Sequence, residues 1–519
     1  MISNRLFFSI FFISCFIFSM SCRSKSNEFV TIALSEKIST LDTLTSTASD
    51  AVAERVRNLM FNSLVRKNEK FEYIGELAKE IKTSDDGKTI TFILQDNVKF
   101  HNGKDFTSAD VKYTFDELFK SNGYKAGSFF ETINDQKVPY IASMEVSDAK
   151  TVSFTLTRPA LKNKFVSNLV TIPIISEGTV EQQKTQPVGT GAFKFTNFDQ
   201  SQNIIELEAN SNYWEGSPKV QKIRVKTVTD ANSLQAELQS GGVDIAPLPT
   251  NLSPDTLKSL GQNPNLKVEQ FKGSNIDYLG FNTQSSPLDK VKIRQAIAYG
   301  INRENIINQL LFGQAEIASS ILPTESWAYN AGKTYNYDPA KARQLIQEAG
   351  YKNELIKFKF GAGNAAVSQY AQVIQNSLKE IGLNVEIETL ESNVIRQQLA
   401  LGQFQMNTGR WIGGNQDPIF LNDLFATAMI PGGKVSCCNR SRYSNSEFDK
   451  IIAEALNTPD RDKAKQLYSK AQEIVGEDLP LFPLWYPANI VVSNKRIGNV
   501  KMNSSGDWNF IKDITVENK

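Results

Sequence analysis

The spacing of hydrophobic residues changes several times along the chain, and each spacing predicts a different element. Residues 29–34 (FVTIAL) form a short, mostly apolar run that is typical of a buried strand. Residues 89–94 (TITFIL) alternate between polar and apolar side chains, which indicates a strand with one buried face. Residues 49–65 (SDAVAERVRNLMFNSLV) repeat apolar side chains at helical spacing and predict an amphipathic helix.

Turn and cap residues separate these elements. Asn102-Gly103 is a strong turn signal, and Thr107 followed by Asp110 has the pattern of a capping box at the start of a helix. Further on, strand-like residues 355–363, helix-like residues 368–382 and strand-like residues 383–390 follow one another. A strand–helix–strand unit implies a parallel sheet, so the chain is predicted to be mixed α/β.

A chain of 519 residues is too long for a single hydrophobic core, so two or three domains are expected. With 40% hydrophobic and 22% charged residues, the composition is that of a soluble globular protein. Lysine and arginine total 57, and aspartate and glutamate total 56, so the chain offers no bulk attraction to nucleic acid or acidic membranes. We therefore expect no nucleic-acid partner, and we expect a monomer.

The N-terminus has the features of a secretory signal. Arg5 precedes an uncharged, mostly apolar stretch that ends at Ser21 and is shorter than the roughly 20 residues needed to span a bilayer. Small residues precede Cys22, although Ser19 stands where the usual lipoprotein pattern has leucine. The segment resembles a lipoprotein signal, which predicts removal of residues 1–21, lipidation of Cys22 and a polar tether up to residue 28. A plain secretory signal and an uncleaved anchor are the alternatives.

Cys437 and Cys438 are the cysteines that remain besides Cys22 and the signal residue Cys15. A bond between neighbours would join Cα atoms about 3.8 Å apart, below the usual lower limit of roughly 4.4 Å for bridged cysteines. We therefore expect two free thiols in a loop, and a fold without a disulfide framework.

Catalytic chemistry has little support in the sequence. His101 is the single histidine and lies beside the Asn-Gly turn, where a structural role is the simpler interpretation. No nucleophile elbow accompanies it, and one imidazole is too few for a typical transition-metal site. We expect no enzyme activity, no cofactor and no metal. The 56 acidic residues leave a carboxylate pair, and so a secreted hydrolase, as the alternative.

One long run, residues 75–118 (GELAKEIKTSDDGKTITFILQDNVKFHNGKDFTSADVKYTFDEL), resembles the signature of the family 5 extracellular solute-binding proteins. These are the peptide, dipeptide and nickel receptors of ABC importers. Further matches follow in the expected order: GTGAFKF (189–195), LEANSNYWEGSPKVQKI (207–223), GGVDIA (241–246), RQAIAYGINRENI (294–306), YSNSEFDKII (443–452), LPLFPLWYP (479–487) and WNF (508–510). The resemblance therefore covers nearly the whole mature chain.

The resemblance implies a two-lobed α/β fold of the periplasmic-binding-protein kind, type II-like and in its large three-domain form, with a hinge and a ligand cleft between the lobes. Lobe one would comprise residues 23–55, 180–265 and 480–519, with an inserted domain at 56–179. Lobe two would comprise residues 266–479. Closure of the lobes around the ligand is the expected motion.

In this family the segment RWIGGNQDP (410–418) faces the cleft. The resemblance implies that Trp411 packs on the ligand and that the amides of Gly413 and Gly414 hydrogen-bond an extended ligand. An ordinary left-handed turn is the alternative. Arg410 would suit an anionic group if it faces inward. Asp417 is a weaker site candidate, because a helix cap is its simpler interpretation.

Gly414 departs from the pattern of the peptide receptors. There this loop resembles Trp-x-x-Asp, whose aspartate pairs with the α-ammonium group of the ligand. Glycine at this position predicts a weak preference for free amino termini. Tyr278 and Asn282, on a strand that enters lobe two, are further ligand-binding candidates, with packing in a buried strand as the alternative.

The resemblance implies a lipid-anchored solute receptor in the cell envelope, on the periplasmic side of a membrane or at the cell surface. It would capture an oligopeptide or similar solute and deliver it to the permease and ATPase of an ABC importer. A secreted hydrolase, a surface receptor or adhesin that does not transport, and an oligosaccharide ligand are the alternatives.

Overall fold

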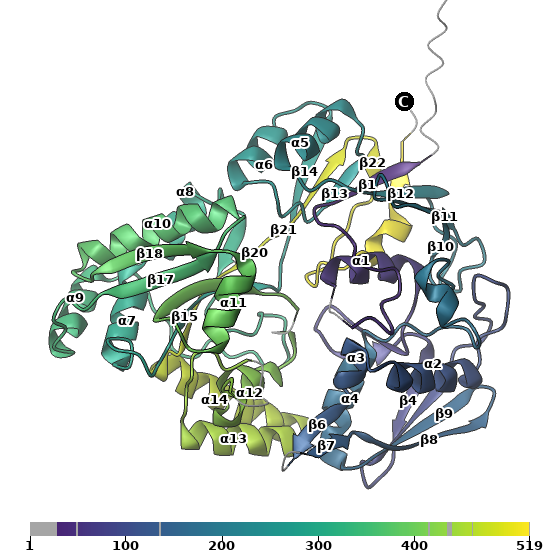
Figure 1. The fold of residues 1–519 in the computed structure, drawn as a ribbon, viewed down its shortest axis with the longest axis horizontal. Coiled ribbons are helices and arrows are strands. Elements are labelled where there is room, and N and C mark those ends of the chain that lie inside the picture. The colour runs from purple at the N-terminus through teal and green to yellow at the C-terminus, as the bar shows by residue number, and fades with distance from the viewer. Residues whose placement is uncertain are drawn as a thin grey trace, which may run out of the picture.

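The computed structural model describes residues 29–47, 50–133, 136–413, 416–432, 438–458 and 460–517. Figure 1 shows the helices and strands gathered into two lobes. The predicted signal, the tether and Cys22 lie outside the described residues. No helix in the described part of the chain is both long and apolar enough to span a membrane.

One lobe is built on a seven-stranded sheet. In spatial order its strands are β10 (Phe193–Asp199), β11 (Ile204–Ala209), β12 (Lys222–Thr227), β1 (Val30–Leu34), β13 (Ile245–Pro247), β21 (Asn489–Asn494) and β14 (Leu266–Phe271). β1 pairs in parallel with β12 and β13, and it is buried along its whole length, as its apolar run predicts. The helices that contact this sheet are α1 (Ala51–Met60), α5 (Ala231–Ser240) and α6 (Pro254–Leu260).

The second lobe is built on a six-stranded sheet. In spatial order its strands are β16 (Ala315–Ile317), β20 (Leu481–Pro487), β15 (Ile276–Phe281), β19 (Met406–Trp411), β17 (Ile356–Gly361) and β18 (Val385–Leu390). β17 and β18 are parallel and flank α10 (Ala365–Glu380), which confirms the predicted strand–helix–strand unit. The other helices of this lobe are α7 (Val291–Gly300), α8 (Arg303–Gln309), α9 (Pro339–Glu348), α11 (Ser392–Ala400), α12 (Phe420–Phe425), α13 (Ser446–Asn457) and α14 (Arg461–Asp478).

A smaller α/β unit follows α1 in the chain. Its four-stranded sheet has the order β4 (Ala78–Thr83), β5 (Thr89–Leu94), β9 (Thr151–Leu156), β8 (Ile141–Asp148). Two hairpins, β2 (Val65–Lys67) with β3 (Tyr73–Gly75) and β6 (Phe130–Ile133) with β7 (Gln136–Pro139), and the helices α2 (Ser108–Ser121), α3 (Tyr124–Gly127) and α4 (Lys162–Leu169) complete it. The predicted cap is confirmed, because α2 begins directly after Thr107, whose N–H donates to the Asp110 carboxylate at 2.9 Å.

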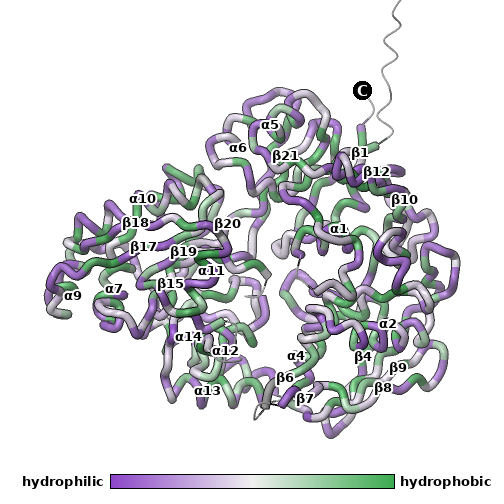
Figure 2. Tube along the Cα trace, viewed as in Figure 1, coloured by the Kyte–Doolittle hydropathy of each residue, from purple (hydrophilic) through white to green (hydrophobic). Residues whose placement is uncertain are grey.

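Burial follows the hydrophobic pattern of each element. β5 alternates between buried and half-buried residues, as its sequence predicts. Figure 2 shows hydrophobic and hydrophilic residues interspersed along the helices and strands of both lobes. One hydrophobic core joins the seven-stranded sheet to the four-stranded unit, and separate cores fill the six-stranded lobe. The two lobes therefore have independent interiors, which is what a hinged pair of lobes requires.

The chain crosses between the large sheets twice, at residues 272–275 and at residue 488. β14, which begins at residue 266, belongs to the seven-stranded sheet, and β20, which follows residue 480, belongs to the six-stranded sheet. At each crossing the chain therefore passes from one sheet to the other several residues after the predicted boundary at 266 or 480. The crossings touch each other at Gly273, where a Cβ atom would lie 1.9 Å from the carbonyl oxygen of Pro487. Only glycine allows this close approach of the two backbones.

Candidate functional site

A cavity of about 140 Å³ lies between the two lobes. The lobe with the seven-stranded sheet contributes Arg55 of α1 and residues from 248–257 and 488–490. The other lobe contributes residues from β15, β19, β20 and the start of α10. The side chains with polar groups in the lining are Arg55, Thr250, Asn275, Asp277, Gln314, Asn364, Tyr370, Arg410, Trp485 and Asn489. Because both lobes line the cavity, its shape depends on the angle at the hinge.

Asp277 and Arg410 form an ion pair in the cavity wall. Arg410 donates to the Asp277 carboxylate through Nε at 2.6 Å and Nη2 at 2.9 Å, and Trp485 Nε1 donates to it at 2.9 Å. Burial lowers the pKa of Arg410, but Asp277 raises it by more, so the guanidinium stays charged. Arg410 thus lines the cavity, as an anion-binding role requires, with its charge already balanced by Asp277.

β19 has a free edge beside the cavity. One edge pairs with β15 along the whole strand, from Met406 to Trp411. The other edge pairs with β17 at Met406 and Asn407 alone. Beyond Asn407, no described strand pairs with that edge of β19. Unpaired backbone N–H and C=O groups at such an edge form a template for another extended chain.

Trp411 packs into its own lobe. Its ring stacks on Tyr278 with centroids 6.0 Å apart and meets the edge of Phe420 at 5.1 Å. The Arg440 guanidinium lies 5.5 Å from the ring centroid. Trp411 Nε1 is buried and has no hydrogen-bond partner among the described residues. The ring is therefore held rigidly, with one polar atom unsatisfied.

The loop after β19 is tied to the hinge crossing. The Gly413 N–H donates to Asn275 Oδ1 at 3.2 Å, so this predicted ligand contact is occupied by a side chain. Gly413 has a φ of 73°, the left-handed conformation of the alternative interpretation. Gly414 lies outside the described residues. The Asp417 carboxylate accepts from the Ile419 N–H at 2.9 Å, which is the cap-like contact that its sequence position suggests.

The two remaining candidates lie inside the six-stranded lobe. Tyr278 is 6% exposed and is covered by Trp411. Asn282 is 4% exposed, and its side chain donates to the carbonyls of Gly402 and Phe404 at 2.9 and 3.0 Å. Neither residue lines the interlobe cavity. Their contacts are those of the packing alternative.

The lobes also touch through the β2–β3 hairpin. Tyr73 donates to the Asp417 carboxylate, and Lys67 donates to Gln416 Oε1 at 2.9 Å. Arg461 of α14 binds Glu72 at 2.6 Å. Burial raises the pKa of Tyr73, and the negative charge of the neighbouring Asp417 raises it further. The phenol therefore stays protonated and donates to the carboxylate. The segment that contains the candidate residues therefore contacts both lobes.

Comparison with known proteins decides the family. A sequence profile described as bacterial extracellular solute-binding proteins, family 5, middle region, matches residues 72–429, which is more than half of the chain. The chain belongs to this family. The family consists of solute-binding proteins, so binding is the established role at this level.

Relatives of the family 5 chain cover most of its length. Heme-binding protein A of Haemophilus influenzae is 28% identical over 473 residues, which cover 85% of this chain and 84% of that protein. The dipeptide-binding protein of Escherichia coli is 28% identical over 484 residues, which cover 88% of this chain and 89% of that protein.

Solved structures confirm the predicted fold. The ABC transporter substrate-binding protein CtaP of Listeria monocytogenes has a TM-score of 0.82 at 22% identity, and the match covers 94% of this chain and 99% of CtaP. The oligopeptide-binding protein AppA of Bacillus subtilis, in complex with a nonapeptide, has a TM-score of 0.73 at 24% identity and covers 94% of this chain and 99% of AppA.

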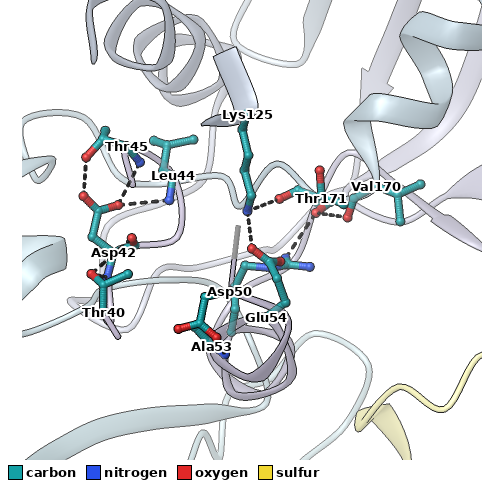
Figure 3. Close-up of polar contacts among 12 residues, drawn as sticks. Thr40, Asp42, Leu44, Thr45, Asp50, Ala53, Glu54, Lys125, Val170 and Thr171 are labelled. Carbon is teal, nitrogen blue, oxygen red and sulfur yellow. Dashed lines mark hydrogen bonds and ion pairs between the residues drawn. The ribbon is translucent and has the colours of Figure 1, made fainter. Parts of the chain in front are cut away.

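A second polar cavity of about 100 Å³ lies where α1 of this family 5 protein meets α3. Figure 3 shows Lys125 between Glu54 and Thr171, bonded to the Glu54 carboxylate at 2.5 Å and the Thr171 carbonyl at 2.7 Å. Burial lowers the pKa of Lys125 to about 8, although Glu54 opposes this. Burial raises the pKa of Glu54, but Arg57 and Lys125 lower it by more. The cluster pairs its own charges and joins α1 to the four-stranded unit.

His101 has the structural role that its position suggests. Its Nε2 lies 3.0 Å from the carbonyl oxygen of Gly191, and its Nδ1 accepts from the Gly189 N–H at 3.4 Å. The imidazole thereby holds the Gly-Thr-Gly segment. Burial lowers the pKa of His101 to about 4, so the ring is neutral at physiological pH.

The expectation of free thiols is wrong for Cys438, which forms a disulfide bond. The other cysteines, Cys15, Cys22 and Cys437, lie outside the described residues. Spacing along the chain cannot show which thiols fold within reach of each other, and outside the cytoplasm such thiols oxidise. Within the described residues, no group of three or more His, Cys, Asp or Glu side chains is placed to hold a metal ion.

Two cavity residues were missed by reasoning from the sequence. Asp277 is the one charged residue in the fully buried strand IDYLGF, and a charge in such a strand signals a buried partner. Arg55 lies within the predicted amphipathic helix, where a polar residue normally faces solvent. Nothing in the local pattern separates Arg55 from an ordinary surface arginine.

Proposed function

We propose that this family 5 protein is the receptor of an ABC importer, and that it captures a peptide between its lobes and delivers it to a membrane permease. The observation that carries the proposal is the free edge of β19 beside a cavity lined by both lobes. An extended peptide pairs its backbone with such an edge and gains affinity that depends little on side chains. The relatives named for dipeptide and oligopeptide binding support this choice.

The proposal includes a lipid anchor at Cys22. The support is the short apolar stretch followed by small residues and a cysteine. Acyl chains contribute roughly 0.8 kcal/mol for each buried CH₂ group, so several chains hold the protein at a membrane durably. The receptor then stays close to its permease.

The proposal also includes a weak preference for a free amino terminus. The family pattern places an aspartate where this chain has Gly414. A carboxylate in a closed cleft contributes a charge-assisted hydrogen bond of roughly 1.5–3 kcal/mol to an ammonium group. Without that carboxylate, N-blocked peptides and peptides held by backbone contacts bind comparably well.

The test identifies the bound solute directly. The mature protein is purified and denatured, and mass spectrometry identifies what is released. Synthetic peptide pools are then added to ligand-stripped protein while its melting temperature is followed. A solute at a hundred times its Kd stabilises the folded state by about 2.7 kcal/mol. Released peptides and a clear melting shift are expected, and the absence of both shows that peptides are the wrong class.

The same samples separate the alternatives. Shortened peptides after incubation indicate a hydrolase, whereas intact peptides agree with a binding protein. A melting shift with oligosaccharides alone indicates a sugar receptor. Loss of labelled-solute uptake in cells that lack the protein indicates an importer component, whereas unchanged uptake indicates a receptor that does not transport.

A further inference from the structure

Two arginines, one from each lobe, line the interlobe cavity. Arg55 comes from α1 in the seven-stranded lobe, and Arg410 comes from β19 in the six-stranded lobe. Asp277 is the remaining charged side chain in the described lining. The cavity therefore carries one net positive charge.

The two arginines differ in how their charges are balanced. Arg410 is held by Asp277 through Nε and Nη2, which leaves its second terminal nitrogen, Nη1, without a hydrogen bond to any described residue. The Arg55 side chain makes no hydrogen bond and no ion pair within 4.0 Å with any described residue. Its carboxylate neighbour, Glu36, acts on it only from a greater distance.

The environment of Arg55 makes this unpaired charge unfavourable. The side chain is only partly accessible to water. Burial lowers the pKa of Arg55, and Glu36 does not fully compensate. A partly desolvated cation without a partner is destabilising, and an anion that reaches it recovers that free energy.

We propose that the solute carries a carboxylate and that Arg55 binds it when the lobes close. This inference rests on the proposed capture of a peptide between the lobes. A guanidinium matches a carboxylate with two parallel hydrogen bonds, and water is excluded from a closed cleft. In a peptide the carboxylate is either the C-terminus or an acidic side chain.

The position of Arg55 also couples binding to closure. Arg55 and Arg410 approach the same cavity from opposite lobes. Without an anion, the unpaired charge of Arg55 loses hydration as the cleft narrows. A solute carboxylate balances that charge, so closure is favoured with an anionic solute and disfavoured with a neutral one.

The experiment is an internal competition between peptide pools. Ligand-stripped mature protein is dialysed against three tripeptide pools at equal concentration. The first has uncharged side chains and a free C-terminus, the second has the same sequences as C-terminal amides, and the third has amides with one glutamate. Mass spectrometry then counts the retained peptides for the wild type and for Arg55→Gln. The control is Arg343→Gln, which alters an exposed arginine on α9.

We expect the wild type and Arg343→Gln to retain the first or third pool about tenfold or more over the second, as a charge-assisted hydrogen bond implies. Whichever of these two pools is retained identifies the source of the carboxylate. In Arg55→Gln, the preference should fall to within about twofold, while neutral amides are retained at least as well as by the wild type and the melting temperature of the ligand-free protein does not fall.

Equal retention of acids and amides by the wild type overturns the inference and leaves peptide capture intact. A tenfold preference that persists in Arg55→Gln overturns the role of Arg55. Retention of no pool by the wild type overturns the peptide proposal itself, and the inference falls with it.

Discussion

Replacement of Asp277 by alanine tests the buried ion pair on which the cavity wall depends. The change removes the acceptor of two hydrogen bonds from Arg410 and one from Trp485. Asp277 is 3% exposed and Trp485 is 1% exposed, so water does not replace the lost carboxylate at the indole. Breaking a buried pair by removing one partner costs about 3–5 kcal/mol.

The expected loss lies near the lower end of that range. The Arg410 side chain is 35% exposed, so its guanidinium regains some hydration. We expect the free energy of unfolding to fall by about 3 kcal/mol. For a domain of 150–250 residues, the size class of this lobe, that corresponds to a melting temperature lower by about 6–12 °C. Scanning calorimetry of ligand-free protein measures the shift.

A matched control and a double variant make the test specific. Asp116→Ala removes an exposed carboxylate that pairs with Lys112, and it should change stability by less than about 1 kcal/mol. Asp277→Ala combined with Arg410→Met should be less destabilising than the sum of the two single changes. The reasoning would be refuted if the loss of stability in the double variant equalled the sum of the two single losses within about 0.5 kcal/mol. A melting shift in Asp277→Ala no larger than that of Asp116→Ala would refute it as well.

Three further changes test other parts of the molecule. Cys22→Ala should leave a soluble or unprocessed protein in cell fractionation, and unchanged membrane attachment would contradict lipidation. Gly414→Asp should raise affinity for peptides with a free amino terminus by about tenfold or more over their N-acetylated forms in calorimetry. Equal gains for both forms would argue against an ammonium contact. His101 has a pKa of about 4 when folded, below its ordinary value of about 6.5, so the unfolded chain takes up the proton first as pH falls. Stability should therefore fall between about pH 6.5 and pH 4 more steeply in the wild type than in His101→Gln, and equal slopes in chemical unfolding would contradict this.

The local pattern of the sequence decided much of the fold. The alternation in β5, the buried run of β1 and the cap at Thr107 are encoded within a few residues, so they were predictable. The parallel β17–α10–β18 unit follows from element order alone. The family resemblance then supplied the two-lobed arrangement, which local patterns do not contain.

The tertiary structure decided the chemistry of the cavity. From the sequence, Arg410 is a candidate residue for binding an anion. In the structure its charge is balanced by Asp277, which lies 133 residues away along the chain. Arg55 and Arg410 share a cavity because the chain crosses between the sheets at 272–275 and again at 488. Charge balance at each arginine depends on distances that are set by the meeting of remote strands. Hydrophobic periodicity fixes which face of an element is buried, whereas the identity of the residue across the gap depends on how whole lobes pack.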